Sequence, residues 1–187
     1  GASTVISGPG GSGKPLIGFA IVDAWLEAGG DIVFLLTNSD AEFVYDTMDL
    51  LYDTDRETID AGVEFVSFDP TMDATVEAIE ETEAGVIRGN LLEPAVWTET
   101  IERALARTEG SGPGTLLFGS ALNLFMFSDT YRDAMLDTFV ETAEREDLTV
   151  LFTVSSSAYA EEIGRVEDAA DTVLLTEMDE GTLRLRG

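Results

Sequence analysis

The sequence predicts an α/β protein with a mostly parallel sheet, helices on both faces of the sheet and an antiparallel C-terminal hairpin. Short, continuously apolar runs recur along the chain, as is typical of parallel strands that are buried on both faces. Longer segments with helical patterning lie between them, and strands that alternate with helices favour a parallel sheet. With 187 residues, 44% of them hydrophobic, the chain is expected to form one domain, residues 1–187, around a substantial core.

Apolar runs bounded by turn residues give the positions of the strands. The predicted strands are residues 3–7, 32–36, 63–68, 115–118, 148–154, 172–175 and 182–186. A turn at Met178-Asp179-Glu180-Gly181 joins the last two strands into the hairpin. The glycine-rich run 110–114 contains no lysine and precedes a strand, so it is predicted to be a plain loop.

Capping residues and helical patterning give the positions of the helices. The predicted helices are residues 14–28, closed by Gly29-Gly30; a helix to about 51, capped by Ser39 or Asp40; 94–107, with Pro94 in its first turn; a helix to about 146, capped by Ser128 or Asp129; and 159–163. Residues 71–90 are acidic and weakly patterned. They are predicted to be a surface excursion with a short helix at 75–81.

The stretch Gly8-Pro9-Gly10-Gly11-Ser12-Gly13-Lys14-Pro15 lies between the first strand and the first helix. Its first seven residues follow the phosphate-loop pattern G-x-x-x-x-G-K. Closely spaced glycines let backbone N–H groups point at an anion, and Lys14 supplies a point charge beside the positive end of the helix. We therefore expect these residues to bind a nucleotide or phosphate. The alternative is a glycine-rich turn that only fits a helix against a sheet.

The charge balance of the chain is extreme. There are 37 acidic and 10 basic residues, so the net charge is −27. Lys14 is the only lysine. This composition resembles that of proteins from salt-accumulating halophiles, where concentrated salt screens the repulsion between carboxylates. The alternative is an acidic interaction surface. No cysteine or histidine occurs, which excludes disulfides, thiolate zinc sites and a Ser-His-Asp triad.

No apolar run is long enough to span a membrane, and no signal peptide precedes the first strand. The expected location is therefore cytoplasmic, with no membrane partner. Nucleic acid is not an expected partner, because the chain is acidic and has no basic stripe.

The opening strand 3–7, followed by Gly8 and the glycine loop, resembles that of the RecA-like ATPases and of their KaiC/RadA branch in particular. Residues 148–156, a strand with its polar end, and the final hairpin, which closes on Leu-Arg-Gly, are also similar to the corresponding segments of KaiC. The resemblance implies a RecA-type P-loop core with an ATP site at the carboxyl ends of the strands, often between the protomers of a ring. It also implies a family segment upstream of residue 1, and a homo-oligomer.

Three positions depart from the pattern of this family. Pro15 replaces the hydroxyl residue that follows the lysine, and proline offers neither a hydroxyl for Mg²⁺ nor an N–H for a phosphate. Gly119 stands where the resemblance implies a metal-holding aspartate at the end of the fourth strand. Thr37 and Asn38 stand where it implies a catalytic glutamate pair, and neither accepts a proton near neutral pH. Mg²⁺ binding is therefore doubtful, and no residue of the chain is predicted to be a metal ligand.

Substitutes for the missing groups are weak candidates. Asn38 would orient a water, whereas Asp40 is a potential base that is better explained as a helix cap. Ser120 and either Ser155 or Ser156 are candidate sensors of a phosphate, and each is also explained as a strand-end turn residue. The candidates for an arginine that acts on the site of a neighbouring protomer are Arg165, Arg184 and Arg186, all late in the chain. For Arg184 and Arg186 the alternative is that their side chains point to solvent.

The sequence therefore predicts a degenerate ATPase. It would bind a nucleotide or phosphate weakly, hydrolyse ATP slowly or not at all, and act in regulation or signalling through contacts with an unknown protein partner. One alternative is an active ATPase that uses Asp40 and Ser120. A RadA-like DNA recombination module is opposed by the charge, and a P-loop kinase by the lack of an arginine-bearing lid. The apolar run 122–127 fits either an oligomer interface or burial in the monomer.

Overall fold

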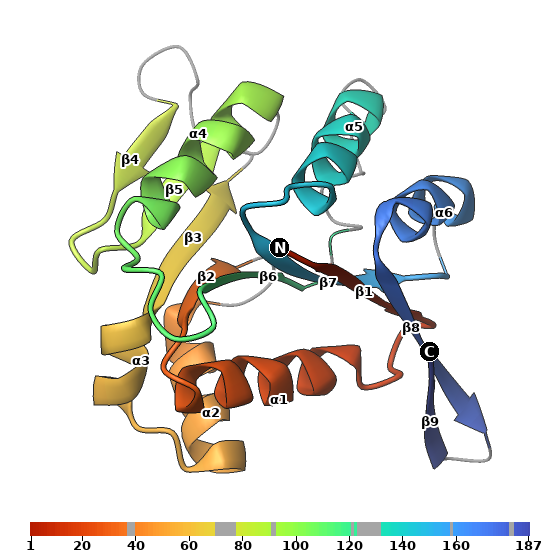
Figure 1. The fold of residues 1–187 in the computed structure, drawn as a ribbon, viewed down its shortest axis with the longest axis horizontal. Helices are drawn as coiled ribbons and strands as arrows, with labels where there is room; N and C mark the ends of the chain where they lie inside the picture. Colours follow the sequence, from red (N-terminus) through yellow and green to blue (C-terminus); the bar gives the residue numbers. More distant parts are fainter. Residues whose placement is uncertain are drawn as a thin grey trace.

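The computed structural model describes residues 1–36, 40–69, 78–90, 93–120, 122, 132–157, 159–179 and 182–187. They form one nine-stranded sheet with the strand order β4-β5-β3-β2-β6-β7-β1-β8-β9 (Figure 1). The strands are β1 (Ser3–Gly8), β2 (Asp31–Leu36), β3 (Val63–Asp69), β4 (Ile79–Glu81), β5 (Ile87–Asn90), β6 (Thr115–Gly119), β7 (Thr149–Ser155), β8 (Thr172–Asp179) and β9 (Thr182–Arg186).

The inner part of the sheet is parallel, and each end carries one antiparallel pair. Strands β5, β3, β2, β6, β7, β1 and β8 run in the same direction, whereas β4 and β9 run antiparallel to their neighbours β5 and β8. The chain leaves β1 for β2, three positions along the sheet, and later inserts β6 and β7 between them. The predicted α/β fold with a mostly parallel sheet and a C-terminal hairpin is confirmed.

Helices cover both faces of the sheet (Figure 1). One face carries α1 (Lys14–Glu27), α2 (Ala41–Tyr52) and α3 (Arg56–Gly62), and the other carries α4 (Pro94–Leu105), α5 (Arg132–Ala143) and α6 (Ala160–Ala169). Each layer has its own core. Phe19, Phe34 and Phe118 meet beneath α1, whereas Trp97 and Phe139 pack between α4 and α5. None of the helices among the described residues combines the length and apolar composition that crossing a membrane requires.

Residues 78–90, the described part of the region predicted as a surface excursion, instead form the edge of the sheet. Residues 79–81 were expected to be helical, but they form β4, and β5 follows after a turn in which Gly85 has a φ of 82°. Ile79 and Ile87 are both buried in the α4–α6 core, which supplies the driving force for pairing. The prediction of a helix at 79–81 is therefore wrong, because tertiary burial outweighs the local preference.

Two other helices differ from expectation. Helix α3 was not predicted; it is capped by Asp55, whose side chain accepts a hydrogen bond from Thr58 N at 2.8 Å, and only Ile59 of the helix is buried. Helix α6 extends to Ala169, because Ile163 and Val166 both pack into the core.

Several predictions lie outside the described residues. These are the caps Ser39, Ser128 and Asp129, residues 75–77 of the predicted short helix, and residues 123–127 of the apolar run. Leu122, the first residue of that run, is fully buried in the α4–α6 core. For this one position, burial within the monomer is the observed outcome.

Candidate functional site

The glycine-rich stretch forms a loop between β1 and α1, at the carboxyl end of the parallel strands. Gly11 and Gly13 have φ values of 76° and 69°, a region that glycine enters without steric cost. Gly8 is required for a different reason: a Cβ atom there would lie 2.0 Å from Thr176 Oγ1 of β8. The loop therefore needs its glycines both for backbone shape and for close packing against β8.

Helix α1 starts directly after the loop, at Lys14. Its N-cap Gly13 provides no side-chain cap, and its first turn contains no acidic residue. The positive end of the helix dipole is therefore not compensated by a side chain, which favours an anion at this position. Pro15 fits the first turn of the helix, but it removes one backbone donor from the set that would face a phosphate.

The only lysine of the chain is folded back onto its own loop. Lys14 Nζ donates hydrogen bonds to Gly8 O at 2.9 Å, Pro9 O at 2.7 Å and Ser12 Oγ at 3.2 Å. Its side chain is buried, and this burial lowers the pKa of the ammonium group from its usual value. If a phosphate bound, Lys14 could exchange its neutral carbonyl partners for a negatively charged one. This ion pair would offset the desolvation of the ammonium group.

Residues from two other strand ends hold the loop in place. Ser12 Oγ and Thr176 Oγ1 lie 2.7 Å apart, and Thr176 Oγ1 also donates to Ser7 O at 3.2 Å. Ser157 Oγ accepts a hydrogen bond from Gly10 N at 3.3 Å. Sequence reasoning did not identify Thr176 or Ser157 as parts of this site, because each approaches the loop only through the pairing of β8 or β7 with β1.

The sensor candidates lie at different distances from the loop. Strand β7 is adjacent to β1, and its last residue, Ser155, is in register with Gly8. Ser156 N donates to Gly8 O at 2.9 Å, so this serine contacts the loop through its backbone, while its side chain is exposed. Ser120 follows β6, which is separated from β1 by β7. The fold therefore brings Ser155 and Ser156 next to the loop and leaves Ser120 one strand further away.

Gly119, at the end of β6, occupies a closed apolar position. A Cβ atom there would meet Phe152 Cδ1 at 3.0 Å and Leu35 Cδ1 at 3.2 Å, and both of these side chains are fully buried. A carboxylate at this position would first have to displace the two apolar side chains. Gly119 itself carries no charge, and buried apolar side chains occupy the space around it. The position therefore does not suit a metal-holding side chain.

The weak catalytic candidates are Asn38, which would orient a water, and Asp40, which would act as a base. Asn38, like Thr37, lies outside the described residues. Asp40 is the N-cap of α2, and one of its carboxylate oxygens accepts a hydrogen bond from Phe43 N at 3.0 Å. The prediction that Asp40 caps this helix is confirmed, and capping commits one of its carboxylate oxygens to the helix.

The late arginines are not free cations. Arg165 on α6 pairs with Asp137 of α5 at 2.6 Å, Arg186 on β9 pairs with Glu177 of β8 at 3.2 Å, and Arg184 also has an interaction partner. Within the described ranges, no group of three or more carboxylate side chains is placed to hold a metal ion. The charged group that the structure places at the loop is Lys14.

No model of a known protein family matches this sequence, and no curated protein matches it. Comparison of the structure with solved structures found 197 matching chains, so the architecture is a common one. Among them is a KaiC-like protein from the hyperthermophilic archaeon Pyrococcus horikoshii, with a TM-score of 0.64 and 13% sequence identity over 98% of this chain and 76% of that chain. At this identity the likeness shows the fold alone: this chain has the RecA-type α/β fold of a KaiC-like protein.

Proposed function

We propose that this protein binds the phosphates of a nucleotide weakly, hydrolyses ATP slowly or not at all, and acts in regulation or signalling through a protein partner. The observation that carries the proposal is the Gly8–Pro15 loop itself. It combines two glycines at positive φ, an uncompensated helix N-terminus and the only lysine of the chain in one anion cradle.

Weak binding follows from the groups that the loop lacks. Pro15 supplies neither a hydroxyl for Mg²⁺ nor an N–H for a phosphate. A hydrogen bond to a charged group contributes roughly 1.5–3 kcal/mol. The loss of two such contacts corresponds to about a hundredfold or more in affinity, because about 1.4 kcal/mol is tenfold.

Slow hydrolysis follows from Gly119 and Asp40. The apolar surroundings of Gly119 do not suit a metal ligand, and Asp40 caps α2. Phosphoryl transfer depends on metal ions and on a residue that positions the nucleophile. The active ATPase that uses Asp40 as its base would have to use the carboxylate oxygen that does not cap α2.

Three further properties belong to the same proposal. The net charge of −27 suits a protein that works in concentrated salt inside the cell, where carboxylate repulsion is screened. Homo-oligomerisation belongs to the proposal as well, because the resemblance to KaiC implies it. DNA is a poor candidate ligand, because the surface lacks the basic stripe that phosphate backbones require.

Isothermal titration calorimetry in molar KCl tests the binding. ATP and inorganic pyrophosphate are titrated with and without Mg²⁺ into the wild type, Lys14→Met and Arg103→Gln. The control also removes one positive charge, from an exposed pair with Glu99 on α4. We expect Lys14→Met to weaken binding by about ten- to a hundredfold and Arg103→Gln to change it less than about twofold.

Phosphate release measured in the same buffer tests the loss of hydrolysis. We expect no release above background with Mg²⁺ present. Turnover on the order of 1 s⁻¹ that disappears in Lys14→Met would contradict the proposal and favour the active ATPase. If Lys14→Met and the wild type bound ATP and pyrophosphate with equal affinity, the proposal would be contradicted, and the glycine-rich loop would be only a structural turn.

A further inference from the structure

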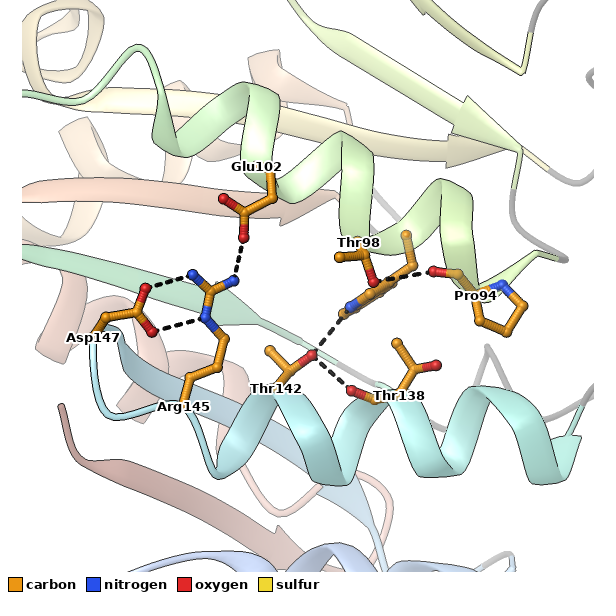
Figure 2. Close-up of polar contacts among 8 residues, drawn as sticks. Pro94, Thr98, Glu102, Thr138, Thr142, Arg145 and Asp147 are labelled. Carbon is orange, nitrogen blue, oxygen red and sulfur yellow. Dashed lines mark hydrogen bonds and ion pairs between the residues drawn. The ribbon is translucent and has the colours of Figure 1, made fainter.

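A second candidate site lies on the face of the sheet that carries α4 to α6, away from α1 and its loop. It is a groove of about 290 Å³ between α4 and α5. Trp97, Thr98 and Ile101 line it from α4, and Thr138, Glu141, Thr142 and Arg145 line it from α5 and the turn that follows. Figure 2 shows Thr98 on α4 and Thr138, Thr142 and Arg145 on the α5 side of this groove.

The threonine hydroxyls of the groove have already used their protons. Thr98, Thr138 and Thr142 each donate to the carbonyl oxygen four residues earlier, at 3.2, 2.8 and 2.7 Å respectively. Thr142 Oγ1 in turn accepts a hydrogen bond from Trp97 Nε1 at 3.3 Å. A hydroxyl has one proton and two lone pairs. With their protons already donated, the hydroxyls of Thr98 and Thr138 can only accept further hydrogen bonds.

The positive charge of the groove, Arg145, is paired with two carboxylates. Arg145 donates through Nε and Nη2 to both carboxylate oxygens of Asp147, at 3.0 and 2.7 Å, and through Nη1 to Glu102 at 2.5 Å. Two carboxylates therefore surround one guanidinium group (Figure 2). An anion entering the groove would find no uncommitted cation and would be repelled by Glu102 and Asp147.

The carboxylate of Glu141, in contrast, is available. Glu141 is exposed at the groove and has no hydrogen bond or ion pair with any other described residue. Ile101 and Trp97, which are both buried, give the groove an apolar wall at its base, beneath this charge. The groove thus combines acceptors, an uncompensated negative charge and an apolar wall.

We propose that the α4–α5 groove binds a small organic cation: a primary ammonium or guanidinium group on a short apolar stem. The N–H groups of such a cation match the acceptors on Thr98 and Thr138, its charge matches Glu141, and its stem packs on Ile101. A neutral apolar ligand would leave the acceptors desolvated without partners, which costs free energy. The volume is close to the lower limit of ordinary ligand pockets, so the cation is a small one.

Titration with n-butylamine and agmatine tests this assignment, with butan-1-ol as the neutral analogue. Binding is followed by calorimetry and by the fluorescence of Trp97 in a Trp25→Phe background, at constant ionic strength. We expect both cations to bind and butan-1-ol to bind at least about tenfold more weakly, since a hydrogen bond to a charged group contributes that much or more. Equal binding of butan-1-ol would overturn the proposal.

Matched variants separate the groove from the acidic surface as a whole. Glu141→Gln and Thr138→Val each remove one recognition group with little change of shape, and we expect each to weaken cation binding about tenfold. Glu57→Gln removes the same charge from exposed α3, on the other face of the sheet, and is expected to change binding less than about twofold.

An equal loss in Glu57→Gln and Glu141→Gln would show general attraction to an acidic protein and would overturn the assignment. Binding of an arginine- or lysine-tipped peptide without binding of the free amines would also overturn it, because the groove would then belong to a protein partner.

Discussion

Introducing at Gly119 the aspartate that the resemblance to RecA-like ATPases implies there provides a sharp test of the site. We predict that Gly119→Asp destabilises the protein and does not restore Mg²⁺-dependent hydrolysis. The new Cβ would meet Phe152 and Leu35 at 3.0 and 3.2 Å, and overpacking of this kind costs roughly 1–3 kcal/mol. Burying a polar group without a partner adds roughly 2–7 kcal/mol. Together they are a large fraction of a typical unfolding free energy of about 5–15 kcal/mol.

The measurement is denaturant unfolding of Gly119→Asp beside Gly119→Ala, which adds the Cβ alone. We expect the alanine variant to lose about 1–3 kcal/mol and the aspartate variant at least about 2 kcal/mol more. Apolar surroundings raise the pKa of the introduced carboxyl group. The folded state then holds a proton that the unfolded state releases, so the gap between the variants widens as the pH rises above about 4. Equal stability of the two variants, with phosphate release from Mg²⁺-ATP in Gly119→Asp, would refute this reasoning.

Four further predictions follow from the site and the charge. Thr176→Val removes the hydroxyl that contacts Ser12 and the β1 backbone. We expect the affinity for pyrophosphate in calorimetry to fall about tenfold, a loss of about 1.4 kcal/mol. Unchanged affinity would exclude Thr176 as a support of the loop. Asp40→Ala should reduce the free energy of unfolding by about 0.5–2 kcal/mol through loss of the α2 cap without changing phosphate release, whereas loss of a measurable turnover would identify Asp40 as a base. Because burial lowers the pKa of Lys14, the folded state binds fewer protons than the unfolded state between the lowered pKa and 10.5. The stability of the wild type relative to Lys14→Met should therefore rise with pH across that window in urea titrations, and a fall would contradict the desolvation of the ammonium group. Finally, raising KCl from about 0.1 to 2 M should raise the Tm, because screening relieves the self-repulsion of a −27 chain; a lower Tm would show that ion pairs dominate instead.

The parts of the site that adjacent residues encode could be predicted from the sequence. The glycine loop, the start of α1 and the cap at Asp40 each depend on contacts within a few residues. Thr176 and Ser157 could not be predicted as supports of the loop, because they approach it from 164 and 147 residues away in the chain. Their positions depend on the register of β1 with β7 and β8, which hydrophobic patterning alone does not specify.

The same distinction explains the errors in the fold. Strand β4 is three residues long and α3 is seven, which is too short for either a period of two or a period of 3.6 to become visible. The substitution at Gly119 could be read from the sequence. Its enclosure by Leu35 and Phe152 could not, because it arises where three strands of the finished sheet meet.

The position of β1 inside the sheet has a consequence for how the chain folds. Its neighbours are β7 and β8, with Ser3 in register with Val150 and Thr4 in register with Thr172. During synthesis β1 must therefore wait until β7 and β8 have been made before it can pair, and such non-local pairing is slow. The anion cradle matures only when β8 docks and Thr176 reaches the loop. Recovery of pyrophosphate binding during refolding should therefore coincide with the last kinetic phase, making the loop a natural reporter of completed folding.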